Sequence, residues 1–139
     1  MKKTAALFLV FIIIFQGFSP FSYAATESNP YFDAYSASIG NPSGNTLQIN
    51  FNIITTDYMD YLGASTAILY KDGSPLKTYS RYNPLYTSSM VTTNTDVFYG
   101  HLSYSNAPAG TYYAEVTFFA TNGTGSGSAI FTTSTITIP

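Results

Sequence analysis

The side chains best suited to acid–base chemistry are one histidine and seven carboxylates, all of which follow residue 24. His101 and Asp96 would supply two members of a serine–histidine–aspartate triad, but no nucleophile-elbow motif surrounds any serine. A lone histidine within a strand pattern seldom forms a site without partners. We therefore interpret His101 as a half-exposed strand residue, and we expect no catalytic residues in this chain.

Pairs of carboxylates suggest two other chemistries. A small hydrolase would use Glu115, Asp60 or His101, yet glycoside hydrolysis needs two acids about 5 to 9 Å apart across a cleft, for which a small domain has little room. Asp57 and Asp60 in "TDYMDYLG" could begin a calcium site, because Ca²⁺ takes roughly six to eight oxygen ligands. Their spacing lacks the EF-hand pattern, so the alternative is a short helical turn that ends at Gly63. Calcium binding stays open.

The first 24 residues have the parts of a secretory signal peptide. Two lysines follow Met1, residues 5–15 form an unbroken apolar run, and small residues at positions 22 and 24 mark a cleavage site. The apolar run is shorter than the roughly 20 residues that span a bilayer. We expect cleavage after Ala24 and a secreted, extracellular product without a membrane anchor.

The predicted mature chain is acidic and free of cysteine. Three basic residues, Lys71, Lys77 and Arg81, stand against seven acids, a net charge of −4. Nucleic acids and anionic membranes attract clustered cations, so we expect neither as a partner. Without cysteine there is no disulfide, thiol nucleophile or cysteine-ligated zinc, and we assign no cofactor or metal.

The elements that must position these residues are short β-strands separated by turns. Alternation is cleanest over residues 46–54, where apolar side chains point one way and amides the other. Residues 55–65 break this alternation and are predicted to form an irregular loop. Other strands are expected at 34–39, 66–71, 76–82, 97–104, 111–121 and 128–138, with turns at 40–45, 72–75, 105–110 and 122–127 and a loop at 83–96.

This pattern predicts an all-β fold, a single antiparallel β-sandwich of about seven strands. The sandwich domain would cover residues 34–139, after the signal peptide at 1–24 and a short lead-in at 25–33.

The stretch "DVFYGHLSYSNAPAGTYYAEVTFFATNGTGSGS" (96–128) resembles the second half of an immunoglobulin or fibronectin type III domain. In those domains a Pro/Gly-rich corner precedes a tyrosine that opens the next strand, and alternating apolar residues then lead to an Ala, an Asn and a Gly-rich turn. Tyr112, Ala120 and Asn122 match that order here. The resemblance implies a tyrosine corner, in which the Tyr112 hydroxyl bonds back to upstream backbone. The chain lacks the tryptophan that the family carries in its core.

Residues 57–73, together with "AGTYYAEVTFFATNGTGS", are also similar to small secreted proteins of Gram-positive bacteria. Those proteins have a signal peptide, one β domain and no assigned activity. The resemblance implies a bacterial source and leaves the activity open.

Aromatic residues outside the core-facing series are the candidates for partner contact. In residues 111–121 the series from Tyr112 to Ala120 is expected to face the core, which leaves Tyr113 and Phe119 on the other face. Exposed rings stack on sugars or anchor peptides, and they also form ordinary cross-strand pairs. We predict a non-enzymatic binding or adhesion protein whose contacts with an extracellular protein or carbohydrate are Tyr58, Met59, Tyr61, Tyr113 and Phe119. The alternatives are an exported matrix subunit that self-associates through strand edges and a small secreted hydrolase.

Overall fold

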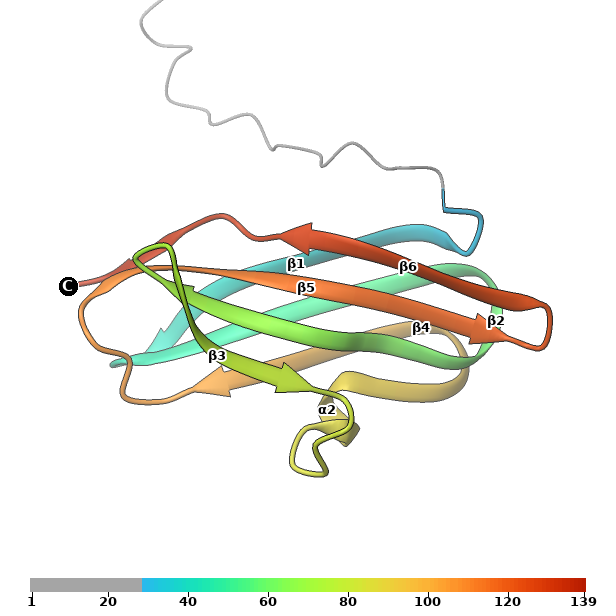
Figure 1. The fold of residues 1–139 in the computed structure, drawn as a ribbon, viewed down its shortest axis with the longest axis horizontal. Helices are drawn as coiled ribbons and strands as arrows, with labels where there is room; N and C mark the ends of the chain where they lie inside the picture. Colours follow the sequence, from blue (N-terminus) through green and yellow to red (C-terminus); the bar gives the residue numbers. More distant parts are fainter. Residues whose placement is uncertain (1–28) are drawn as a thin grey trace, which may run out of the picture.

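The computed structural model describes residues 29–139, so the predicted signal peptide and the first part of the lead-in lie outside the described residues. Apart from one short helix, the described chain consists of strands and their connections (Figure 1). No helix in this range is long and apolar enough to cross a membrane. The elements are β1 (Phe32–Ser43), β2 (Thr46–Lys71), β3 (Ser74–Ser80), α2 (Thr87–Met90), β4 (Val91–Tyr104), β5 (Gly110–Asn122), β6 (Gly125–Thr132) and β7 (Ile136–Ile138).

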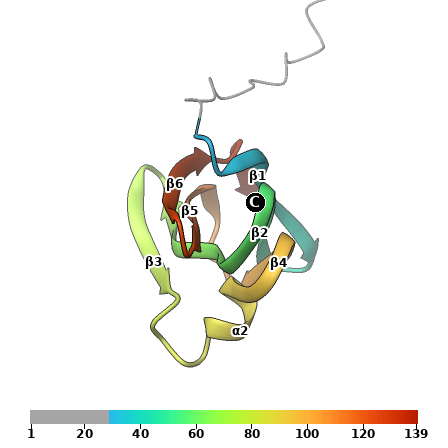
Figure 2. The same cartoon turned by 90° about the vertical axis from the view of Figure 1, so that its right-hand side faces the viewer.

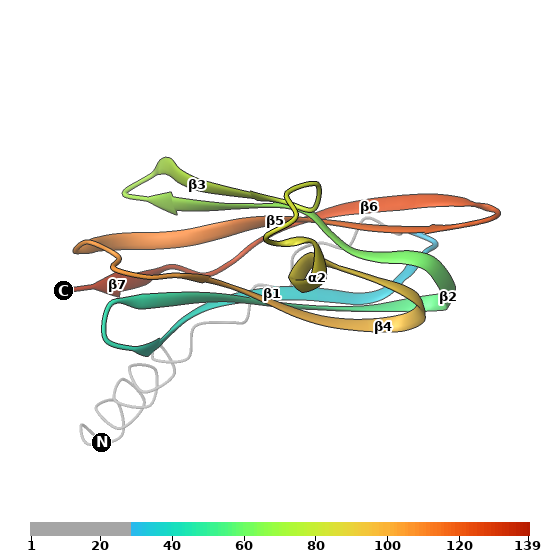
Figure 3. The same cartoon turned by 90° about the horizontal axis from the view of Figure 1, so that it is seen from below.

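These strands form one antiparallel sheet that curls into a half barrel. Its order is β1-β2-β5-β6, with β3 and β4 also paired to β2 and β7 paired to β5. From below, β1, β4 and the first half of β2 form one layer, and β3, β5 and β6 form the other (Figure 3). The end-on view shows the curl that joins the two layers (Figure 2). The predicted all-β class and antiparallel pairing are confirmed.

Strand β2 runs without interruption for 26 residues, so the loop or helical turn predicted at 55–65 is wrong. Its first half pairs with β1 and β4, and its second half pairs with β5 from Tyr61 and with β3 from Thr66. The pairing with β4 continues to Gly63, with a register shift between Ile54 and Met59. The alternation breaks there because the strand bulges as it passes from one layer to the other. The buried Thr55 hydroxyl donates to the Asp57 carbonyl oxygen at 2.9 Å and so pairs a backbone acceptor that the bulge leaves free.

Other boundaries also differ from the prediction. The turn after β2 is only Asp72 (φ 49°) and Gly73 (φ 82°), both in the left-handed region, so the following Ser-Pro already belongs to β3. The predicted last strand is divided into β6 and β7 at Thr133, whose hydroxyl replaces a ladder partner by accepting the Ala114 N–H at 2.9 Å. β1 is longer than 34–39, and β4 begins directly after α2.

The core lies between the two layers. As the alternation predicted, the apolar side chains of the first half of β2 are buried, and so is the series of β5 from Tyr112 to Ala120. The largest members are Leu47, Ile49, Phe51, Ile53, Met59, Leu62, Leu69, Tyr79, Met90, Leu102, Tyr112, Val116, Phe118 and Ile138.

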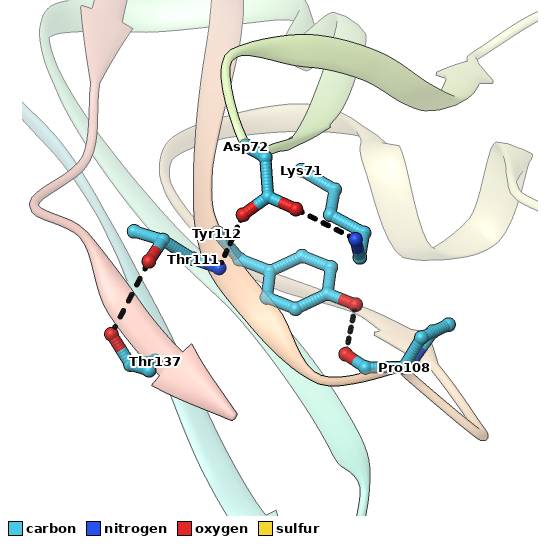
Figure 4. A network of polar contacts seen from close by, with 6 residues as sticks. All are labelled: Lys71, Asp72, Pro108, Thr111, Tyr112 and Thr137. Carbon is cyan, nitrogen blue, oxygen red and sulfur yellow. Dashed lines mark hydrogen bonds and ion pairs between the residues drawn. The ribbon is translucent and has the colours of Figure 1, made fainter. Parts of the chain in front are cut away.

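A polar network closes one end of the half barrel (Figure 4). The buried Tyr112 hydroxyl donates to the Pro108 carbonyl oxygen, which is the hydrogen bond that a tyrosine corner implies. The Asp72 carboxylate accepts the Thr111 N–H at 2.9 Å and pairs with Lys71 at 2.7 Å. The side-chain bond from Lys71 is the largest cause that lowers the pKa of Asp72, followed by the bond from Thr111. The network ties the turn between β2 and β3 to the start of β5.

Candidate binding site

Tyr113 is half-buried, and its ring is covered by a residue of the neighbouring strand. It stacks on Tyr70 of β2, with centroids 4.6 Å apart and an interplanar angle of 4°. The register places the two residues directly opposite each other. Burial, together with the neighbouring Glu115 carboxylate, raises the pKa of the Tyr70 hydroxyl. The Tyr113 ring thus has a partner within the sheet itself.

Phe119 is only 7% exposed, although it belongs to the outward-facing series of β5. An arginine covers it: the guanidinium carbon of Arg81 lies 3.9 Å from the centroid of the Phe119 ring. The same carbon lies 4.8 Å from the centroid of the Tyr82 ring, and Nη2 donates to the Tyr82 hydroxyl at 2.7 Å. Arg81 is therefore held against two aromatic rings, within cation–π distance of both.

Beside these rings lies an open hollow of about 390 Å³. Its walls come from β2, from β5, from the segment that joins β3 to β4 and from the first residue of β4. They comprise Tyr61, Arg81, Tyr82, Thr87, Val91, Phe119 and Thr121. Two of the five predicted contact residues, Tyr61 and Phe119, meet in this one site.

The other predicted contact residues lie elsewhere. Tyr58 is 70% exposed but does not line the hollow. Met59 is 1% exposed and belongs to the core, because β2 continues as a strand here and turns successive side chains to opposite faces. Its side chain is thus not on the surface. Tyr113 belongs to the stacked pair described above.

Gly63 allows the end of α2 to lie close to β2, beside the hollow. A Cβ atom at Gly63 would lie 2.0 Å from the Met90 carbonyl oxygen and 2.9 Å from the Val91 Cα. Gly63 was predicted to end a helical turn, but it lies within β2, opposite Val91 on one side and Phe119 on the other. Its missing side chain lets the end of α2 come against the strand.

The segment at 81–90 is fixed by several contacts. The Arg81 N–H donates to the Ser65 carbonyl oxygen at 3.1 Å, and the Thr87 hydroxyl donates to the Arg81 carbonyl oxygen at 2.7 Å. Tyr86 packs edge-on against Tyr79, with ring centroids 5.0 Å apart. The N–H and the carbonyl oxygen of Arg81 are therefore both held by hydrogen bonds within the protein.

The charge of Arg81 has no carboxylate partner among residues 29–139. The one ion pair in that range joins Lys71 to Asp72, and the Lys77 ammonium lies 5.7 Å from the centroids of two tyrosine rings. The Nε atom of Arg81 is buried and makes no hydrogen bond to any residue that the structure describes. Buried polar atoms nearly always have a hydrogen-bond partner, so this unpaired N–H is unusual for a folded protein.

The side chains considered for catalysis or calcium binding do not line the hollow. His101 is exposed on β4, Asp57 and Asp60 are exposed on β2, and Glu115 is half-buried on β5. Within the described part of the chain, no three histidine or acidic side chains gather where they could hold a metal ion.

A second, smaller hollow of about 260 Å³ lies on the outer face of β1, β2 and β4. Ser36, Asn52 and the 69% exposed Tyr99 contribute to it, and the Ser36 hydroxyl donates to Asn52 Oδ1 at 2.6 Å. Sequence reasoning missed Tyr99, Arg81 and Tyr82. The strand alternation indicates an outward Tyr99. Arg81 and Tyr82 are the last two residues of the strand predicted at 76–82, and nothing there indicates a site; in the structure β3 already ends at Ser80.

No protein-family model matches this chain, and no curated protein or solved structure shows significant similarity to it.

Proposed function

We propose that this chain is a secreted, non-enzymatic binding protein that holds its ligand in the hollow between Tyr61 and Tyr82. The observation that carries the proposal is Arg81, a half-buried cation without a carboxylate partner in residues 29–139, fixed between aromatic rings at a surface hollow. Tyrosine and arginine dominate the energetics of binding surfaces, and concave sites with a few fixed polar groups are where ligands bind.

The proposed architecture is an immunoglobulin- or fibronectin type III-like sandwich. The two layers of the curled sheet and the bond from Tyr112 to the Pro108 carbonyl support it. Secretion is supported by the signal-like pattern of residues 1–24. The non-enzymatic part is supported by the positions of His101, Asp60 and Glu115, which lie on three different strands and do not line the hollow.

The test is a titration of the ¹⁵N-labelled protein, followed by NMR, with a set of soluble saccharides and short peptides. We expect amide shifts around the hollow for at least one member, and a loss of that binding in Tyr61→Ala and Tyr82→Ala. The matched control is Tyr58→Ala, which removes an exposed tyrosine from the same strand as Tyr61 but outside the hollow. Unchanged binding in both hollow variants would contradict the proposal.

A second candidate function is self-association through strand edges. It is favoured by β1, which among the described strands pairs only with β2 and whose one charged residue, Asp33, lies near its start. Charges on edge strands normally block such pairing. Size-exclusion chromatography tests it, and a monomer at high concentration would count against a matrix subunit.

A further inference from the structure

We infer that the ligand of the hollow is an acidic saccharide, a sugar whose C6 carboxylate pairs with Arg81. This inference rests on the proposed function, since it names the chemical class of ligand for the same site.

The first step concerns the charge. Arginine has five N–H donors. Here Nη2 donates to the Tyr82 hydroxyl, and Nε is buried without an acceptor among the described residues, so the terminal nitrogens are the donors open to a ligand. No acidic residue lines the hollow. A planar guanidinium matches a carboxylate through two parallel hydrogen bonds. A carboxylate is therefore the group best matched to the charge that Arg81 brings to the hollow.

The second step concerns the backbone. Tyr61 pairs with a residue on each side, Thr93 and Thr121, so its main chain lies within the sheet rather than at an edge. The N–H groups of Arg81 and Thr87 already donate to carbonyl oxygens within the protein. Peptides bind mainly by adding to a free strand edge or by placing a terminal carboxylate in a nest of free N–H groups. The hollow offers neither, which disfavours a peptide.

The side chains that remain fit a sugar. Tyr61 is 54% exposed and Tyr82 is 78% exposed, and both border the hollow together with Thr121, whose side chain carries a hydroxyl. Aromatic rings present flat apolar faces against which the C–H face of a sugar ring can stack, and hydroxyl groups pair with sugar hydroxyls. Recognition by rings, a hydroxyl and one guanidinium needs no backbone contribution.

The number of charges limits the ligand further. Of the three cations in residues 29–139, Lys71 is paired with Asp72 and Lys77 lies over Tyr79 and Tyr86, which leaves Arg81 alone at the hollow. An acidic protein with one such cation repels densely charged polymers. The site thus suits a single uronate residue rather than a heavily sulfated chain.

The test compares two probes that differ only in the group at C6, methyl β-glucuronide and methyl β-glucoside, by calorimetric titration of the purified protein. We expect the glucuronide to bind at least ten-fold more tightly. Arg81→Gln should bind the two probes equally. Arg81→Lys keeps a cation and an alkyl stem over Phe119 but loses the planar fork, so it should fold normally and lose most of the preference. Lys77→Gln is the control cation and should keep the full preference.

Three outcomes would overturn the inference, and they differ in what they leave of the proposed site. Equal binding of both probes by the wild-type protein, lost in Tyr61→Ala, would overturn the role of the carboxylate while leaving the hollow as a binding site. Binding of a capped peptide with a free C-terminal carboxylate, but of neither sugar, would overturn the saccharide. An undiminished glucuronide preference in Arg81→Lys and Arg81→Gln would overturn the inference as well.

Discussion

The carbonyl oxygen of Met90 occupies the space that a Cβ atom at Gly63 would need, 2.0 Å from that atom's ideal position. This close approach brings α2 against β2, and the segment that carries Arg81 leads directly into α2. The shape of the hollow therefore depends on one glycine in the longest strand.

Replacing Gly63 with alanine should destabilise the protein by roughly 1–3 kcal/mol, because the backbone at Met90 must move away. Urea unfolding followed by circular dichroism measures this loss. Gly123→Ala is the matched control, since a Cβ there meets nothing within 4 Å, and its effect should stay within about 0.5 kcal/mol. Equal stability of the two variants would show that the contact with Met90 is not tight.

The stacked pair of Tyr70 and Tyr113 should behave as a structural unit. We expect Tyr113→Ala to lower stability and to leave ligand binding unchanged, because the ring contacts its neighbour rather than the hollow. A double-mutant cycle with Tyr70→Ala should give a coupling of about 0.5–1.5 kcal/mol. Additive effects would mean that the stacking contributes nothing.

Tyr112 should contribute to stability through its hydroxyl as well as through its buried ring. Tyr112→Phe removes the hydrogen bond to Pro108 and should cost about 0.5–1.5 kcal/mol. Tyr99→Phe removes the same atom from an exposed ring and should cost close to nothing. Thermal unfolding of the two variants measures the difference. Equal melting temperatures would mean that the hydrogen bond to Pro108 does not stabilise the fold.

Stability should fall at alkaline pH because of Tyr79. Its burial, with smaller contributions from Tyr86 and Tyr104, raises the pKa of the hydroxyl from 10 to about 12. The unfolded chain loses this proton near pH 10 while the folded protein keeps it, so the contribution is complete below pH 10 and is lost as the pH rises to about 12.

The matched variant for this prediction is Tyr79→Phe, which cannot ionise. Across that pH range the stability of the wild type should fall relative to Tyr79→Phe by on the order of 2 kcal/mol. Parallel pH profiles for the two proteins would contradict a raised pKa.

Much of the fold follows from local sequence pattern. The alternation of residues 46–54 and the series from Tyr112 to Ala120 identify buried faces that the structure confirms. The strand through residues 55–65 could not be predicted, because a bulge between Ile54 and Met59 moves the strand between layers and disrupts the period of two. Whether a broken alternation means a loop or a bulge depends on tertiary pairing.

The candidate site was predictable only in part. Tyr61 and Phe119 were recognised as aromatic residues outside the expected core, but nothing local indicates that they share a wall. Arg81 and Tyr82 follow β3 and reach the site because of the chain path that Gly63 permits. A glycine within an apolar strand pattern signals a close backbone approach, without indicating which segment approaches.

The most direct test of the central claim is an NMR titration of the protein with methyl β-glucuronide, in which the side-chain Nε–H signal of Arg81 is observed. This proton has no hydrogen-bond acceptor within residues 29–139. We predict that its resonance shifts on saturation, together with the backbone amides of Tyr61 and Thr121. Shifts confined to the face around Tyr99, with Arg81 unchanged, would place the ligand elsewhere and contradict the claim.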